Sequence, residues 1–273
     1  MLLFPNAKIN LGLHVIEKRR DNFHNIETVF YPVPWKDLLE VLQDDTQPSG
    51  VTLNNTGLKI PGSLNENLCV KAYELISRDY PMPAVKTHLH KQIPTGAGLG
   101  GGSSDAAFFI RALSQLFELN LSWGELHHYA KQIGSDCSFF ITNMPVMAEG
   151  KGDELEPVKL SLKDYHILIV HPGIHISTPE AYKMVKVSKP HLSLEKIIQE
   201  SPVEDWKQLL KNDFEEPVFS NYPRIAALKE KMYADGAVYA AMSGSGSAVF
   251  GIFHEKIPAA KYFPGNIVWQ GKL

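Results

Sequence analysis

A glycine-rich segment at residues 96–102 is the first place in this sequence where residue types and spacing indicate chemistry. Five of its seven residues are glycine. Glycine loses more backbone entropy on folding than any other residue, so such a cluster indicates a backbone that must approach something closely. A predicted strand at 84–93 precedes the cluster and a predicted amphipathic helix at 104–119 follows it. Because the first turn of a helix offers unbonded N–H groups and a positive dipole end, the pattern predicts a phosphate-binding loop.

Three interpretations of this loop compete. A flexible linker is disfavoured because the strand and the helix bracket the glycines tightly. Gly96, Gly98 and Gly101 match the dinucleotide pattern G-x-G-x-x-G, but the helix leads into another helix rather than a second strand. A Walker A loop would end in Gly-Lys-Ser/Thr, which is missing. The sequence therefore favours a loop of another type for the phosphates of ATP, with hydroxyl donors from Ser103 and Ser104 at the helix cap. The residues assigned to it are Pro94, Thr95, Gly96, Ala97, Gly98, Leu99, Gly100, Gly101, Gly102, Ser103 and Ser104.

Phosphoryl transfer also needs a carboxylate to orient the attacking hydroxyl and a cation to stabilise charge. Asp136, after Gly134 and Ser135, is the candidate base, but the same residue type caps helices, and a short helix at 136–141 would use it that way. Lys8 is the candidate cation, and its alternative is a solvated lysine at a strand edge. The residues alone leave both alternatives open.

Composition limits the classes of partner. The chain has 273 residues, a net charge of −3 and no run of Lys or Arg, so a nucleic-acid partner is not expected. Its two cysteines do not make a disulfide framework, which favours a reducing, cytoplasmic location. We expect no membrane partner, because the N-terminus does not resemble a signal peptide and no apolar run reaches the length of a membrane span.

The hydrophobic pattern changes near residues 149–152, and we place a boundary there between domains at 1–150 and 151–273. Further strands in the first half are expected at 8–16, 26–33, 38–42 and 50–60, with helices starting near 65 and at 122–133, the latter with a capping box. In the second half, strands are expected at 165–170, 237–242 and 248–253, and helices at 179–187, 194–199 and 224–233.

Three motifs together resemble those of the GHMP kinases. They are Asn6-Ala7-Lys8-Ile9-Asn10-Leu11, the glycine-rich loop ending in Ser104-Asp105-Ala106, and Met242-Ser-Gly-Ser-Gly-Ser-Ala-Val-Phe250. Their order spans almost the whole chain. The resemblance implies an α+β, two-domain GHMP kinase fold, with an N-terminal β-rich α/β domain that carries the phosphate loop and a C-terminal α/β sandwich domain.

The resemblance is strongest to the branch of that family that phosphorylates the 2-hydroxyl of cytidine diphosphate methylerythritol in the non-mevalonate (MEP) pathway. It implies ATP and Mg²⁺ as cofactors and Lys8 and Asp136 as catalytic residues. It further implies that Asn67, Leu68 and Lys91 lie near the adenine, and that substrate contacts come from Asn10, Phe23, His24, Tyr182, Gly244 and Ser245. This chain has Cys137-Ser138 where the family usually has Val-Pro, and Phe23 where a tyrosine is common.

Two rival functions remain. Another GHMP kinase, for homoserine or mevalonate, would not need an aromatic slot for a base, which Phe23, His24 and Tyr182 would form. A non-catalytic nucleotide-binding protein would not need both Lys8 and Asp136. The remaining histidines, including His88, His90 and the pair 127–128, show no zinc spacing, so we assign no metal ligand. The sequence leaves a monomer and a homodimer equally open.

Overall fold

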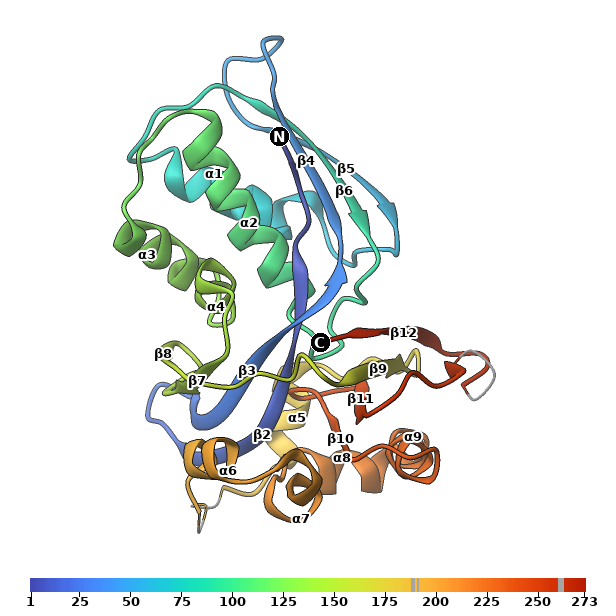
Figure 1. The fold of residues 1–273 in the computed structure, drawn as a ribbon. Coiled ribbons are helices and arrows are strands. Elements are labelled where there is room, and N and C mark those ends of the chain that lie inside the picture. Colours follow the sequence, from blue (N-terminus) through green and yellow to red (C-terminus); the bar gives the residue numbers. More distant parts are fainter. Residues whose placement is uncertain (188–189, 191, 260–262) are drawn as a thin grey trace. The chain divides into compact units, whose positions relative to one another are not determined.

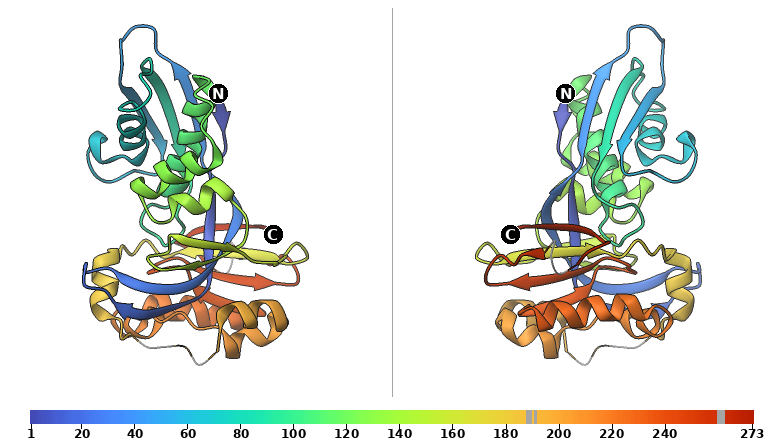
Figure 2. Two further views of the ribbon diagram at one scale, coloured as in Figure 1. Left: turned by 90° about the vertical axis from the view of Figure 1, so that its left-hand side faces the viewer. Right: turned by 90° about the vertical axis from the view of Figure 1, so that its right-hand side faces the viewer.

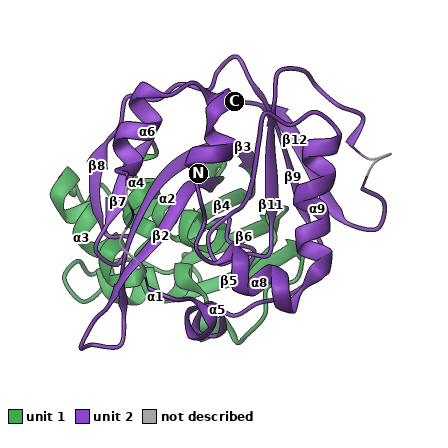
Figure 3. Cartoon of the chain, turned by 90° about the horizontal axis from the view of Figure 1, so that it is seen from below, with its two compact units in different colours: residues 1–7, 36–95, 100–143 green, residues 8–35, 96–99, 144–273 purple. Residues whose placement is uncertain are grey.

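The structure is a computed structural model that describes residues 1–187, 190, 192–259 and 263–273. Its contacts divide the chain into two compact units, which Figure 3 shows in different colours. Unit 1 comprises residues 1–7, 36–95 and 100–143, and unit 2 comprises residues 8–35, 96–99 and 144–273. The last segment of unit 2 begins at residue 144, whereas the sequence placed a boundary after residue 150. Unit 2 also takes in an early stretch and the tip of the glycine-rich loop.

Unit 1 packs helices against one face of a sheet, as Figure 1 shows. The strand order is β1-β4-β6-β5, with β5 parallel to β6 and the other pairs antiparallel. Alternate residues of β6, among them Val85, Thr87 and Leu89, are buried. Helix α2, which buries Phe109 and Ile110, contacts the neighbouring strand β4. The elements of this unit are β1 (Leu2–Leu3), β4 (Leu38–Gln43), β5 (Val51–Gly57), η1 (Leu64–Glu66), α1 (Leu68–Ile76), β6 (Val85–Lys91), α2 (Gly101–Leu116), α3 (Trp123–Ile133) and α4 (Cys137–Thr142).

Unit 2 contains two antiparallel sheets. The strand order is β2-β3-β7-β8 in one sheet and β10-β11-β9-β12 in the other, and α9 packs along one face of the second (Figure 2). The strands are β2 (Asn6–Lys18) and β3 (His24–Lys36), whose outer ends belong to unit 1, then β7 (Val146–Glu149), β8 (Glu154–Pro157), β9 (His166–His171), β10 (Tyr239–Met242), β11 (Val249–Phe253) and β12 (Ile267–Lys272). The helices are α5 (Thr178–Met184), α6 (Leu194–Glu200), η2 (Val203–Asp205), α7 (Trp206–Leu209), α8 (Glu215–Asn221) and α9 (Pro223–Ala234).

Most elements expected from the sequence are present, and the capping box at the start of α3 is confirmed. Ser122 Oγ accepts from Glu125 N at 3.3 Å, and Glu125 Oε2 accepts from Ser122 N at 2.8 Å. The change of pattern near 149–152 is a hairpin turn between β7 and β8, with Gly150 and Gly152 at positive φ. No expectation covered β1, β7, β8, β12, η2, α7 or α8. Each is short, and α8 contains a proline, so local patterns were too weak to reveal them.

A buried ion cluster in unit 1 fixes both ends of the glycine-rich loop. The Lys91 ammonium, at the end of β6, bonds Asp37, and Lys91 Nζ donates to Asp105 Oδ2 of α2 at 2.7 Å. Asp37 Oδ1 also accepts the backbone N–H groups of Gln92 and Ile93 at 2.6 and 2.9 Å. Because one cation lies between two carboxylates, the cluster connects the strand before the loop to the helix after it.

Burial shifts the protonation of this cluster. Burial, together with the nearby Asp37 carboxylate, raises the pKa of Asp105 to about 7, although Lys91 opposes the shift. Burial alone would lower the pKa of Lys91, but Asp105 and Asp37 outweigh it and raise that pKa. Asp105 Oδ1 is buried and has no hydrogen-bond partner among the described residues. Near neutral pH, the cluster is therefore close to taking up a proton on Asp105.

We expect Asp105→Asn to flatten the dependence of stability on pH. A carboxyl group whose pKa is higher in the folded than in the unfolded state stabilises most below about pH 4, its unfolded pKa. That stabilisation is lost as the pH rises through the folded value near 7. The unfolding free energy of the wild type should therefore fall relative to Asp105→Asn between pH 4 and about 7.5, by on the order of a few kcal/mol. Urea unfolding across this range measures the difference, and parallel pH profiles for the two proteins would show that Asp105 has an ordinary pKa.

Candidate active site

Lys8 lies on β2 and is buried, with 3% of its surface exposed. Lys8 Nζ donates to Asn10 Oδ1 at 2.7 Å and lies 4.8 Å from the centre of the Phe30 ring. Asn10 Nδ2 in turn donates to Thr28 Oγ1 at 3.0 Å. These contacts exclude the alternative interpretation of Lys8 as a solvated residue at a strand edge. They hold the ammonium in one place, as an electrostatic role in phosphoryl transfer requires.

The tip of the glycine-rich loop, residues 96–99, packs in unit 2 against the segment 243–248. Ser243 Oγ donates to Gly98 O at 2.8 Å and lies 3.4 Å from Asn10 Oδ1. Ala248 N donates to Ala97 O at 3.1 Å, and Lys8 N donates to Leu99 O at 2.9 Å. The three motifs of the sequence analysis therefore meet through hydrogen bonds at this tip. Ser243, which the sequence analysis did not single out, makes the side-chain contact.

The start of α2 offers backbone donors for an anion. The helix begins at Gly101, with Gly100 as N-cap at positive φ and no side-chain cap. The first N–H bonded within the helix is that of Ser104, to Gly100 O at 2.9 Å. The N–H groups of the three preceding residues therefore lack partners inside the helix. Ser103 and Ser104 lie in the first turn rather than at the cap, so the cap expected from the sequence was wrong by about one turn.

Asp136 lies in unit 1 between α3 and α4 and is half-buried. Asp136 occupies the N-cap position of α4. Its side chain makes no capping hydrogen bond to the described residues of that helix. The capping interpretation is therefore right about position and wrong about the side chain. Beside it, burial raises the pKa of the Cys137 thiol to about 12, so this thiol stays protonated at neutral pH. Asp136 belongs to unit 1 and Lys8 to unit 2.

Three residues expected near the adenine lie in unit 1. Asn67 is the N-cap of α1, and its Oδ1 accepts from Cys69 N at 2.9 Å. Leu68 is half-buried at the start of that helix. Lys91 is 2% exposed, and its ammonium bonds the two carboxylates of the ion cluster. These contacts make Lys91 a support of the loop, and we leave it out of the proposed site.

A cavity of about 890 Å³ in unit 2 contains the aromatic residues expected to bind a base. The rings of His24 and Tyr182 stack with centroids 4.6 Å apart and planes 17° apart. Phe23 is 55% exposed, and Lys151 Nζ lies 4.9 Å from the centre of its ring. Burial, with a smaller effect of Lys18, lowers the pKa of His24, so the neutral ring offers one donor and one acceptor at pH 7.

Basic residues of the same cavity escaped the sequence analysis. Lysines at four positions line it, and they come from separate parts of the chain: Lys18, Lys151, Lys183 and Lys186. These lysines do not form a run of basic residues. The sequence pointed to them only through their neighbours, since Lys183 follows Tyr182 and Lys151 lies between two glycines. An aromatic slot beside several ammonium groups suits a nucleotide, whose base stacks and whose phosphates carry negative charge.

Two protein-family models match this sequence. The model described as GHMP kinases N terminal domain matches residues 67–143, and the model described as GHMP kinases C terminal matches residues 194–262. Together the two matches cover more than half of the chain. A crystal structure of homoserine kinase from Cytophaga hutchinsonii has a TM-score of 0.75 at 16% identity, covering 100% of this chain and 94% of that chain, which shows the fold alone. Fold and loop thus define the class, that of the GHMP kinases, and the linker and dinucleotide interpretations were wrong.

Similar curated proteins indicate which family of GHMP kinases the chain belongs to. The 4-diphosphocytidyl-2-C-methyl-D-erythritol kinase of Bacteroides thetaiotaomicron is 46% identical over 275 residues and covers all of both chains. That of Cytophaga hutchinsonii is 50% identical over 258 residues, covering 94% of this chain and 93% of its own. A crystal structure of 4-(cytidine 5'-diphospho)-2C-methyl-D-erythritol kinase has a TM-score of 0.84 at 31% identity, covering 99% of this chain and 98% of that chain. The chain belongs to the 4-diphosphocytidyl-2-C-methyl-D-erythritol kinase family.

Gly98→Ala should destabilise the protein, whereas Gly102→Ala should not. At Gly98, φ is +80° and an added Cβ would lie 1.9 Å from Ser243 O. The left-handed backbone alone costs roughly 1–2 kcal/mol for alanine, before the clash is counted. At Gly102, inside α2, an added Cβ meets nothing within 4 Å, and alanine stabilises helices by up to about 1 kcal/mol relative to glycine. Urea unfolding compares the two variants, and equal free energies of unfolding would contradict the close contact at Gly98.

Proposed function

We propose that this protein transfers the γ-phosphate of ATP to the 2-hydroxyl of 4-diphosphocytidyl-2-C-methyl-D-erythritol, a step of non-mevalonate isoprenoid precursor biosynthesis. The observation that carries the choice of acceptor is the cavity with Phe23, His24 and Tyr182 and its lysines. A cytosine base fits the aromatic slot, and the ammonium groups offset the charge of a diphosphate. Homoserine and mevalonate have neither group.

The proposed chemistry follows from the groups described. The acceptor hydroxyl oxygen bonds the γ-phosphorus, the bond from that phosphorus to the bridging oxygen of ADP breaks, and Asp136 takes the hydroxyl proton. Lys8, held by Asn10, stabilises the negative charge of the transferring group. The unbonded N–H groups at the start of α2 bind the phosphates of ATP, and Asn67 and Leu68 are proposed to lie near the adenine.

Mg²⁺ is proposed to enter with ATP. No group of three or more His, Cys, Asp or Glu side chains in the described part of the chain is arranged to hold a metal ion. A magnesium ion that enters with ATP is coordinated mainly by phosphates and water and needs few protein ligands. The Ser104 hydroxyl, buried in the first turn of α2 and unpartnered among described residues, is the candidate ligand. When bound, the metal neutralises charge on the phosphates.

We also propose that the enzyme works in the cytoplasm as a monomer or homodimer, without nucleic-acid or membrane partners, since ATP and the acceptor are small polar metabolites. No helix in the ranges that the structure describes is long and apolar enough to cross a membrane. Both cysteines are free and buried.

Turnover should depend on the cytidine compound. We expect ADP release in the presence of ATP, Mg²⁺ and 4-diphosphocytidyl-2-C-methyl-D-erythritol, and none with homoserine or mevalonate, in a coupled spectrophotometric assay. Phe23→Ala should raise KM for the cytidine acceptor at least about tenfold, because stacking on an aromatic ring contributes roughly 1–3 kcal/mol per base.

The matched control is Phe4→Ala, the same change at another exposed phenylalanine, 47% accessible and in unit 1. It should leave KM unchanged. Turnover of homoserine or mevalonate by the wild type would support kinase activity but contradict the proposed cytidine site. Equal losses for ATP and acceptor in Phe23→Ala would place Phe23 outside the acceptor site.

Asp136→Asn should lower kcat by about a hundredfold to ten-thousandfold, the usual effect of removing a positioned acid–base group, while ATP binding stays intact. The amide keeps the shape of the side chain and cannot take the proton. Asp164→Asn, at an exposed position, is the control and should not change kcat. Near wild-type kcat for Asp136→Asn would remove Asp136 from the mechanism.

A further inference from the structure

Residues 211–214, between α7 and α8, and Glu215, the first residue of α8, contact parts of unit 2 that the proposed mechanism uses. Asn212 is 2% exposed and pairs with Leu13 of β2 in an isolated parallel bridge. Leu13 N donates to Lys211 O at 2.8 Å, and Val15 N donates to Asp213 Oδ2 at 2.9 Å. The segment is therefore joined to the strand that carries Lys8 and Asn10.

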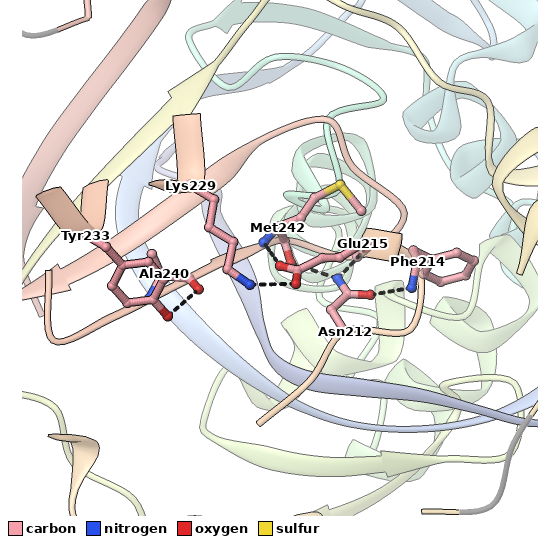
Figure 4. Close-up of polar contacts among 8 residues, drawn as sticks. Asn212, Phe214, Glu215, Lys229, Tyr233, Ala240 and Met242 are labelled. Atoms are coloured by element: carbon pink, nitrogen blue, oxygen red, sulfur yellow. Dashed lines mark hydrogen bonds and ion pairs between the residues drawn. The ribbon is translucent and has the colours of Figure 1, made fainter. Parts of the chain in front are cut away.

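Asn212 also holds the backbone on both sides of Ser243, as the dashed lines of Figure 4 show in part. Asn212 Nδ2 donates to Met242 O at 2.8 Å and to Gly244 O at 2.9 Å. Asn212 Oδ1 accepts from Phe214 N at 3.0 Å, and Glu215 Oε1 accepts from Met242 N at 2.8 Å. Since Ser243 lies between the two anchored carbonyls, its contact with Gly98 O depends on them.

Phe214 connects the same segment to the base slot. Its side chain is 1% exposed, and its ring meets that of Tyr182 edge to face with centroids 4.9 Å apart. Tyr182 in turn stacks on His24. Neighbouring residues of one short segment thus support two different places, the tip of the phosphate loop and the aromatic slot.

We infer that Asn212 and Phe214 are positioning residues with separate effects: Asn212 positions Ser243 against Gly98 at the tip of the proposed ATP-phosphate loop, and Phe214 positions Tyr182 for the cytidine acceptor. A purely structural role is the alternative. The polar contacts favour positioning, because a buried amide costs free energy unless it is bonded, and both donor hydrogens of this one go to the backbone around Ser243. The inference rests on the proposed function for its choice of ligands.

Two variants test the inference, because each is expected to impair the use of a different ligand. Asn212→Asp keeps the size of the side chain and the acceptor for Phe214 N, but it turns an oxygen toward two carbonyl groups. It should lower kcat/KM for ATP at least about tenfold and change KM for the acceptor less than about threefold. Phe214→Leu keeps the site apolar and removes the ring contact with Tyr182, so it should raise KM for the acceptor at least about fivefold and spare ATP.

Lys229→Met is the control. Lys229 Nζ donates to Glu215 Oε2 at 2.6 Å on the far side of the same cluster (Figure 4), so its loss should lower the melting temperature without changing either kinetic constant. If Asn212→Asp and Phe214→Leu each impair the use of ATP and of the acceptor alike, in proportion to their lost stability, the residues are ordinary core and the inference is wrong. If the wild type does not phosphorylate the acceptor, the proposed function fails. Calorimetric ATP binding still tests Asn212 in that case, and unchanged affinity in Asn212→Asp would overturn its role.

Discussion

The carbonyl oxygen of Ser243 lies where the side chain of residue 98 would be, and the arrangement of the candidate site in unit 2 depends on that contact. An added Cβ at Gly98 would be 1.9 Å from this oxygen, closer than any atom tolerates. Because the backbones touch, the Ser243 hydroxyl reaches Gly98 O, and Lys8 N reaches Leu99 O. Segments far apart in sequence are thereby held by backbone groups together with the Ser243 hydroxyl.

In unit 1 the corresponding constraint is electrostatic. One ammonium, that of Lys91, is shared by Asp37 and Asp105 in a site with almost no solvent. Charge in such a site is costly unless it is paired, and here one carboxylate remains in excess, which agrees with the raised pKa of Asp105. The cluster connects the ends of the loop without taking up its N–H groups, so the first turn of α2 keeps its donors for a ligand.

Local patterns predicted the local features of this protein. The glycine cluster, the capping box at Ser122 and the strand β6 all follow from residues close in sequence. The start of α2 was placed too late because Gly101 and Gly102, which lie in its first turn, are poor helix formers. The partners of Lys91, the His24–Tyr182 stack and the lysines of the cavity depend on residues brought together from distant parts of the chain. No single-sequence pattern contains that information.

Unit 2 is assembled from residues at opposite ends of the chain, and this sets the order in which it can form during synthesis. Strand β12, at residues 267–272, pairs along β9, while β2 meets Asp213 across 198 positions of sequence. Closing such long loops slows folding. Strands β2 and β3 are neighbours in one sheet and can pair early, but the contact of β2 with Asp213 must wait until that residue has been synthesised.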